Sequence, residues 1–321
     1  MRALFAAMSL CLLATASCGS AGNEAPKPNV SPRAADAGVA ADAGPPPGYV
    51  RYTTSAVTVA PGTSTQWIQW VAAPFDHDVD VADVQGKQSF GGHHALLTSM
   101  KEMKSVGTQV AWQDSNFASA QFLGGIGGEG GNSLEKLPPP AVSRLPKGRA
   151  IAIMTHYLNA GSTPLEGTSQ LDVRYADPSP SDVVASLFTN TSVSFQVPAQ
   201  GSLHVDLKCA VKQDVSLLMF ANHMHQWGTA VSTSVVDSTG TRTVIKDDPA
   251  WDPEWTTNPN FTKFTVAAPY VLHAGDTLTT SCDWSNTTAS PLSFPTEMCV
   301  FVAHYLGSSD LTCVGGTFMA L

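Results

Sequence analysis

Charged residues are scarce in this sequence: they make up 13% of the 321 residues, and the formal net charge is −9. A protein that binds nucleic acid through its phosphates needs clustered lysine and arginine. Here 17 Lys and Arg face 26 Asp and Glu, an excess of the opposite sign. The composition therefore predicts that nucleic acid is not a partner.

A membrane-spanning run is also missing near the N-terminus. The apolar and small residues from Ala3 to Ala16 number about 14, whereas a transmembrane helix needs about 20. A run of that length behind Met1-Arg2 is typical of an export signal. Ala16-Ser17-Cys18 follows it and resembles the lipobox of bacterial lipoproteins, although Thr15 stands where that motif usually has leucine. We predict a signal over residues 1–18, a lipid on Cys18 as the only membrane contact, and a place in the cell envelope, in the periplasm or on the outer membrane surface. Ordinary secretion is the alternative.

Helical periodicity is nearly absent as well, and short alternating segments take its place. Residues 19–48 hold mainly Ala, Pro, Gly, Asn and Asp without an apolar period, which predicts a disordered or extended tether. Alternation typical of strands starts near Tyr49 and recurs with turn signals every 8 to 12 residues or so, which favours an all-β sandwich or barrel. Strands are expected, among other places, at Tyr52–Val59, Ser192–Val197, Leu217–His225, Phe261–Val266 and Glu297–Tyr305, and the longest irregular stretch at residues 124–140.

The length that remains after the tether, about 270 residues, suffices for two domains of ordinary size. Two prolines interrupt the strand pattern in Asp177-Pro178-Ser179-Pro180. Because such clusters mark loops, we place a domain boundary there and predict domains over 49–178 and 179–321.

Cysteine is rare outside the export signal and the lipobox. The four remaining cysteines, Cys209, Cys282, Cys299 and Cys313, all lie in the last third of the chain. An even number in an exported chain predicts disulfides, and four cysteines allow three pairings. The two predicted domains therefore differ in how they are stabilised.

Histidines supply the candidate chemistry. His223 and His225 stand in Ala221-Asn222-His223-Met224-His225, at the end of an expected strand. Side chains alternate along a strand, so the two imidazoles would share one face and form half of a transition-metal site. A His-x-His pair by itself is more often without a metal.

Three other segments are weaker candidates when taken singly. His93 and His94 are adjacent, so a regular strand would turn them to opposite faces, one buried and one exposed; both can bind one metal only if a bulge distorts the strand, which the preceding Gly91-Gly92 would permit. His156 ends another expected strand. Met298 precedes Cys299, and a strand there would set one toward a metal and the other toward a disulfide; a lone methionine is usually a core residue. His77, His204, His273 and His304 are expected to be structural.

Taken in order, these segments resemble the type II copper, ascorbate-dependent monooxygenases, the family of peptidylglycine α-hydroxylating monooxygenase and dopamine β-monooxygenase. The residues that carry the resemblance are Gly92-His93-His94, Thr155-His156-Tyr157, His223-Met224-His225 and Thr296-Glu297-Met298-Cys299, together with Ala274–Cys282 and, less completely, Trp67–Pro74. Their order and approximate separation match over residues 50–315. Each motif is unspecific alone, whereas their joint occurrence is specific.

The resemblance implies two tandem antiparallel jelly-roll β-sandwich domains with two coppers per chain. His93, His94 and His156 would bind an electron-storing copper, and His223, His225 and Met298 an oxygen-activating copper at the catalytic site. It also implies the disulfides Cys282–Cys299 and Cys209–Cys313. Three imidazoles tolerate both copper oxidation states, and a thioether favours Cu(I), so the ligand types suit these roles.

The implied reaction inserts one atom of O2 into a C–H bond of a small-molecule substrate, with electrons from ascorbate or an equivalent reductant. In the peptide-amidating members an arginine two residues before the His-x-His pair helps to hold the substrate carboxylate, and this chain has Ala221 there. Their asparagine and tyrosine after the methionine are Val300 and Val302 here. A peptide ending in glycine is therefore not expected as substrate, and a less polar one is.

Two other classes stay open on the sequence. A copper-binding or electron-transfer surface lipoprotein without turnover would explain the missing substrate clamp. A structural β-sandwich with fortuitous histidines would explain the weakness of each motif alone.

Overall fold

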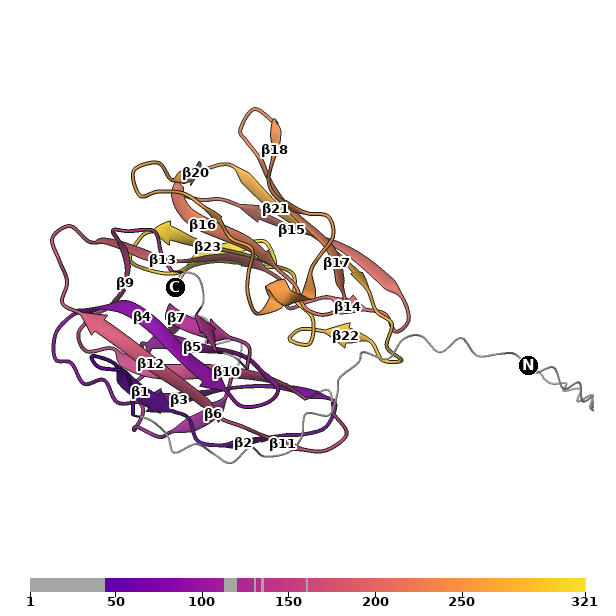
Figure 1. Cartoon of the computed structure of the whole chain (residues 1–321). Helices are drawn as coiled ribbons and strands as arrows, with labels where there is room; N and C mark the ends of the chain where they lie inside the picture. The colour runs from indigo at the N-terminus through magenta and orange to yellow at the C-terminus, as the bar shows by residue number, and fades with distance from the viewer. Residues whose placement is uncertain (1–43, 113–119, 130, 134–135, 160) are drawn as a thin grey trace, which may run out of the picture. The chain divides into compact units, whose positions relative to one another are not determined.

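The computed structural model describes residues 44–112, 120–129, 131–133, 136–159 and 161–321. Strands dominate these residues, and the helical element that they contain is a short 3-10 helix, η2 (Pro253–Thr256). The predicted all-β class, built from β-sandwiches, is confirmed (Figure 1). The predicted signal, Cys18 and the tether up to residue 43 lie outside the described residues.

The N-terminal half, residues 44–176, is built from two main sheets. One contains, in spatial order, β1 (Val50–Thr53), β12 (Ser169–Ala176), β4 (Val79–Gln88) and β9 (Ala141–Leu145). The other contains β6 (Gln109–Ala111), β3 (Thr63–Val71), β10 (Ala150–Asn159), β5 (Gly92–Met100), β7 (Ala120–Gly127) and β8 (Asn132–Ser133). The strands β2 (Val57–Val59) and β11 (Leu165–Gly167) form a separate pair. Buried apolar residues of both main sheets, such as Val173 and Ile153, meet in one core.

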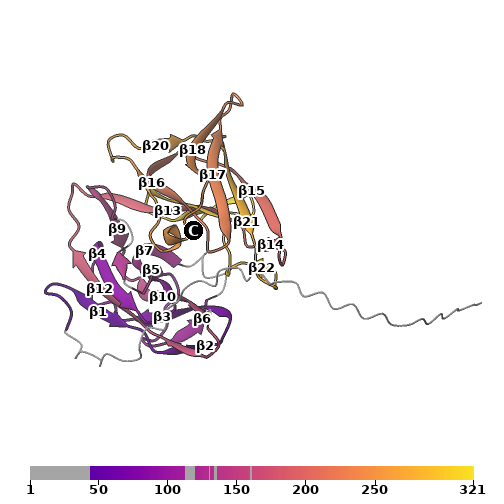
Figure 2. The same cartoon turned by 45° about the vertical axis from the view of Figure 1, so that its right-hand side comes forward.

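The C-terminal half, residues 183–321, repeats this two-sheet plan (Figure 2). One layer contains β13 (Val183–Thr191), β23 (Val300–Leu306) and β16 (Val215–His223), extended by β19 (Thr262–Lys263), β20 (Tyr270–Leu272), β24 (Leu311–Val314) and β25 (Thr317–Ala320). The other contains β15 (Ser202–Ala210), β21 (Thr277–Ser285), β17 (Gly228–Val236) and β18 (Arg242–Asp248). A small pair is formed by β14 (Gln196–Val197) and β22 (Leu292–Ser293). Leu217 and Phe301 of the first layer pack with Leu278 of the second.

The two halves share one sheet. Strands β9 and β13 pair in parallel, Val183 with Ala141 and Val184 with Val142, so that a single sheet of eleven strands runs through both halves. Gly44–Leu321 form one compact unit. The boundary expected near Asp177–Pro180 falls between β12 and β13, and the division into two domains stays a prediction.

Several expected strands end earlier or begin later than predicted. Strand β16 stops at His223, because the amide of His225 donates to a side chain instead of a neighbouring strand. Strand β23 begins at Val300, because residues 294–297 form turns in which the Glu297 amide donates to the carbonyl of Ser293. Of Ser192–Val197 only β14 forms, since the Ser192 hydroxyl accepts from the amide of Ser194 and competes with strand pairing.

Three further expectations also need correction. Tyr52–Val59 is divided between β1 and β2, and Phe261–Val266 shrinks to β19. The stretch expected to be irregular from Gly124 instead continues strand β7 to Gly127. Glycines weaken a strand because they have no side chain to pack and lose more backbone freedom. Here the backbone hydrogen bonds of β7 with β5 hold the strand in place.

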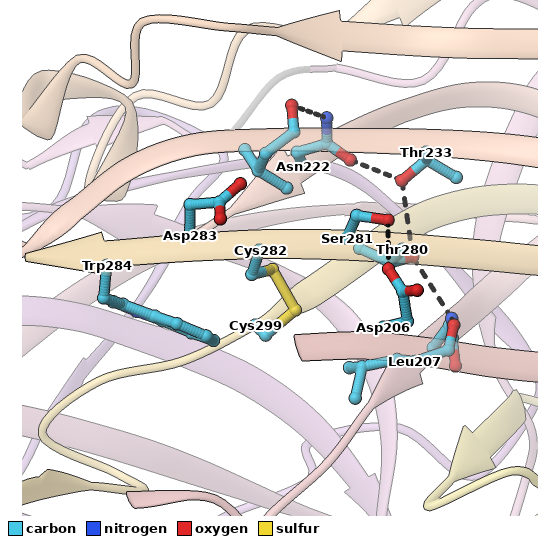
Figure 3. Close-up of a disulfide and its surroundings, with 12 residues drawn as sticks. Asp206, Leu207, Asn222, Thr233, Thr280, Ser281, Cys282, Asp283, Trp284 and Cys299 are labelled. Atoms are coloured by element: carbon cyan, nitrogen blue, oxygen red, sulfur yellow. Dashed lines mark hydrogen bonds between the residues drawn. A yellow bond between two sulfur atoms is a disulfide. The ribbon is translucent and has the colours of Figure 1, made fainter. Parts of the chain in front are cut away.

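Disulfides occur in the C-terminal half. Cys209 is bonded to Cys313. Cys282 is bonded to Cys299 (Figure 3). These are the two pairs that the resemblance implies. All four cysteines are fully buried. The described residues include no helix that is long and apolar enough to cross a membrane.

Candidate metal centre

His93 and His94 are brought to one side by a bulge at the start of β5. Strand β10 pairs His156 with His94 and then Tyr157 with Gly92, so His93 is the extra residue of the ladder. The two imidazole centroids are 4.7 Å apart. Gly92 permits this path, since a Cβ there would lie 2.3 Å from the Cβ of Gln88. The bulge is the condition under which adjacent histidines can serve one site.

His156 completes a group of three imidazoles in the N-terminal half. Its centroid lies 4.8 Å from that of His93 and 5.1 Å from that of His94. The hydroxyl of Ser64 on β3 is 2.6 Å from its Nε2 atom, whereas its Nδ1 atom is buried without a hydrogen-bond partner. A buried ring nitrogen without a partner is costly, and a metal ion would satisfy it.

His223 and His225 reach the same region by a different route from the one predicted. His223 is the last residue of β16, opposite Val300 on β23. His225 lies beyond the strand, so alternation does not place its ring. The Nδ1 atom of His225 is 2.9 Å from the carbonyl oxygen of Thr296, and its own carbonyl accepts from the indole of Trp251. The two imidazole centroids are 5.1 Å apart.

The hydrogen bond to Thr296 assigns the tautomer of His225. A carbonyl oxygen can only accept, so Nδ1 carries the hydrogen and Nε2 of the neutral ring is left as an acceptor. This arrangement, in which a backbone carbonyl orients the imidazole, is common behind metal-binding histidines.

Glu297 joins the histidine segment to the methionine segment. Its fully buried carboxylate accepts hydrogen bonds from the amides of His225 and Trp227 at 3.2 and 2.8 Å and from the indole of Trp284 at 2.9 Å. Burial raises its pKa to about 7, and these donors oppose the rise. In the sequence, Glu297 stands out only as part of the motif Thr296-Glu297-Met298-Cys299. The one signal of a buried role is an acidic residue at the head of an apolar segment.

Met298 follows Glu297 directly and is 9% exposed. Its neighbour Cys299 is held to Cys282 on β21, beside Trp284 (Figure 3). The disulfide and the Glu297 hydrogen bonds thus fix the backbone on both sides of the methionine. A role of its sulfur as a ligand stays a prediction.

The five histidines form one cluster that contains two overlapping groups of three. His93, His94 and His156 make one group whose ligand atoms lie within 4.8 Å of one another, and His93, His223 and His225 make a second. His93 belongs to both, and its Nε2 atom is 3.2 Å from Nε2 of His225. The structure therefore places the candidate histidine ligands of the two predicted sites side by side.

Burial keeps all five imidazoles neutral. It lowers the pKa of His94 to about 3 and that of His225 to about 4. For His93, His156 and His223, burial and then the neighbouring imidazoles hold the pKa well below its usual value. Neutral imidazole is the form that binds metals.

The donor set fits copper. Both groups consist of imidazoles alone, with no carboxylate among the clustered residues that the structure describes. Imidazole nitrogens suit copper and zinc, whereas Mg²⁺ and Ca²⁺ require oxygen ligands. The buried Nδ1 atom of His156 is one open position for such an ion.

An apolar surface adjoins His223. Ala221 on β16 pairs with Val302 on β23, two residues before the pair formed by His223 and Val300. Ala221 is fully buried, and the two valines are half-buried.

The four other histidines stand apart from the cluster. His77, His204 and His273 are largely exposed and pair with aspartates. His304 is buried on β23 against Phe122 of β7.

Residues 183–315 match the family model of the copper type II ascorbate-dependent monooxygenase C-terminal domain. The match includes His223, His225 and Met298, so the C-terminal half carries the sequence pattern of this copper-enzyme domain. No protein of curated function matches the chain. Among solved structures, peptide:N-glycanase F is 10% identical with a TM-score of 0.36, over 82% of this chain and 97% of its own. The major capsid protein P2 of bacteriophage PM2 is 10% identical with a TM-score of 0.32, over 80% and 97%.

Proposed function

We propose that this protein is a copper-dependent monooxygenase that hydroxylates a C–H bond of a small organic substrate, using O2 and an ascorbate-type one-electron reductant. The observation that carries the proposal is the cluster of five neutral imidazoles, three of them buried and two half-buried. Two of the five lie in the segment that matches a copper monooxygenase domain. Apolar side chains would fill the same space in the fold more favourably than five clustered imidazoles, so packing alone does not explain the cluster.

In this proposal His93, His94 and His156 hold one copper, and His223, His225 and Met298 hold the other. Copper would supply one-electron transfer and the activation of O2. The chain itself orients the ligands: the Thr296 carbonyl directs Nε2 of His225 toward the cluster, and Glu297 holds the turn that carries this ring.

The substrate is proposed to be apolar near its reacting carbon. Ala221, Val300 and Val302 next to His223 offer no hydrogen bond from their side chains and no charge. A carboxylate brought against them would lose its hydration without gaining a partner, which is unfavourable by several kcal/mol. Peptides ending in glycine are therefore expected to be poor substrates.

A second candidate is a copper-binding or electron-transfer surface lipoprotein that does not turn over a substrate. The same apolar positions favour it, because the side chains of Ala221, Val300 and Val302 offer no polar group that would hold a substrate. Oxygen consumption separates the two: an oxygenase consumes O2 with ascorbate in proportion to an added organic substrate, whereas an electron carrier does not.

The test uses the chain loaded with two equivalents of copper. Candidate substrates are screened with ascorbate for a product that has gained one oxygen atom. Met298→Leu should abolish product formation, and Met219→Leu, the same change at a buried methionine of β16, should preserve it. Full activity of Met298→Leu would show that the assigned oxygen site is wrong.

Location forms a separate part of the proposal. The two buried disulfides indicate an oxidising compartment. We infer export to the cell envelope with a lipid on Cys18. Mass spectrometry of the mature N-terminus tests this, because a chain that starts after residue 18, or that carries no acyl group, would contradict it.

A further inference from the structure

His93 is the only histidine that belongs to both groups of candidate ligands in the described part of the chain. It comes from the N-terminal half, yet its Nε2 atom is 3.2 Å from Nε2 of His225 in the C-terminal half. Its centroid lies 4.7 Å from that of His225 and 6.2 Å from that of His223. The second group is therefore made of ligands from both halves.

Close contacts along β7 join the two halves. The Asp310 carboxylate accepts from the amides of Phe122 on β7 and Leu187 on β13, both at 2.9 Å. At the other end of β7, where Gly127 pairs with His94, a Cβ at Gly127 would lie 2.1 Å from the carbonyl oxygen of Thr257, just after η2. We call these contacts the seam. The approach of His93 to His225 is thus part of a packed interface.

The contact between the two rings is a single hydrogen bond. Nε2 of His225 is an acceptor, since its Nδ1 hydrogen points at Thr296, so Nε2 of His93 must donate. His93 and His225 are 3% and 2% exposed, so both rings are shielded from water. Three imidazoles whose ligand atoms lie within 4.8 Å of one another are a ready ligand set for Zn²⁺ or Cu²⁺.

We propose that one divalent transition-metal ion binds between the halves through His93, His223 and His225 and locks the seam closed. This set differs from the two-histidine, one-methionine set of the proposed oxygenase, because an imidazole from the other half takes the place of the thioether. Harder divalent ions favour the imidazole, and Cu(I) favours the sulfur. The inference rests on the geometry of the cluster and not on the proposed oxygenase activity.

The experiment uses Zn²⁺, which has no redox chemistry, and the full chain. Hydrogen exchange is measured in peptides that contain the Phe122 and Leu187 amides, with and without saturating Zn²⁺. Binding only to the closed form should slow these amides by about tenfold or more, since the ligand shifts the opening equilibrium by mass action. His93→Gln and His223→Gln should remove the slowing. His94→Gln, which lies in the other group only, should retain it.

Circular dichroism of each variant shows whether it folds, and His223→Gln carries the test if His93→Gln does not fold. Slowing that persists in His93→Gln, or that never occurs in the wild-type chain, overturns the proposal. Equal loss in His94→Gln also overturns it, because the ion would then lie within the N-terminal half. Failure of the oxygenase proposal would be seen separately, as copper-loaded chain that forms no product while Zn²⁺ still slows exchange.

Discussion

The two halves build the same kind of sandwich and stabilise it in different ways. The C-terminal half carries both disulfides and the match to the copper monooxygenase domain. The described residues of the N-terminal half contain no disulfide, and their histidines lie outside the matched range. The halves also present imidazoles differently, by a bulge at His93 in one and by a strand end at His223 in the other. The two halves can therefore contribute histidines to one cluster although only one half has disulfides and the local backbone at the histidines differs.

The largest effect is expected from the Cys209–Cys313 disulfide. It joins residues 104 positions apart, and the loss of such a link costs about 4–5 kcal/mol in the chain-entropy model. The double change to serine should make the C-terminal half unfold first in guanidinium, followed by tryptophan fluorescence. Removing Cys282–Cys299, with a separation of 17, should cost about 3 kcal/mol. Unchanged midpoints in both variants would mean that the two halves do not differ in this respect.

The N-terminal half should depend correspondingly more on its core. Ile153 is fully buried between the sheets. Ile153→Ala should destabilise by about 2–5 kcal/mol, because it leaves a cavity in a core without covalent support. The midpoint of unfolding measures this, with the exposed Val106→Ala as the matched control that should change it little. Equal midpoints for the two variants would contradict the importance of the core.

The seam should respond to pH through Asp310. Burial raises its pKa to about 6, against the two amide donors and Arg149. Between about pH 4 and 6 the folded chain keeps a proton that the unfolded chain releases, so this group's contribution to stability falls as pH rises, by about 3 kcal/mol in total. Asp310→Asn should abolish that slope in unfolding measured from pH 4 to 7. The comparison with the variant is needed because His304, with its pKa lowered to about 4 by burial, contributes a slope of opposite sign.

The smallest effect is expected from Glu297→Gln, which tests whether Glu297 positions the metal ligands or only supports the fold. Glu297→Gln puts an amide hydrogen against backbone donors of the His225 turn, so copper should bind about 10- to 100-fold more weakly to the C-terminal ligands, as for other changes behind metal ligands. The Cu(I)–sulfur signal in X-ray absorption should also weaken. Asp276→Asn, at a buried carboxylate that caps the turn at His273, should leave both unchanged. A normal sulfur signal in Glu297→Gln would limit Glu297 to a structural role.

Much of the fold could be predicted because alternation and short apolar runs are local properties. Strands β10 and β16 follow from such apolar runs. The need for a bulge at His93 follows from its adjacency to His94. The ends of β16 and β23 could not be predicted in the same way. After β16, the amide of His225 donates to the Glu297 carboxylate, which is distant in sequence. Before β23, the amide of Glu297 donates to the Ser293 carbonyl within a turn.

The candidate site could be predicted in its residues and not in its arrangement. The order of the motifs pointed to five histidines, each assigned to its own half. Their meeting at His93 depends on how β7 packs against residues after η2, a contact that involves backbone atoms and leaves no side-chain pattern in the sequence.

Gly127 gives that contact a practical meaning. The Thr257 carbonyl oxygen lies 2.1 Å from where a Cβ would be, and Gly127 pairs with His94, so the absence of one carbon atom allows this close approach beside a candidate ligand. Any other residue at this position would clash with the Thr257 carbonyl and push the two segments apart. A graded series of side chains there would act as a set of spacers between β7 and the residues after η2, each changing the distance between the two groups of imidazoles.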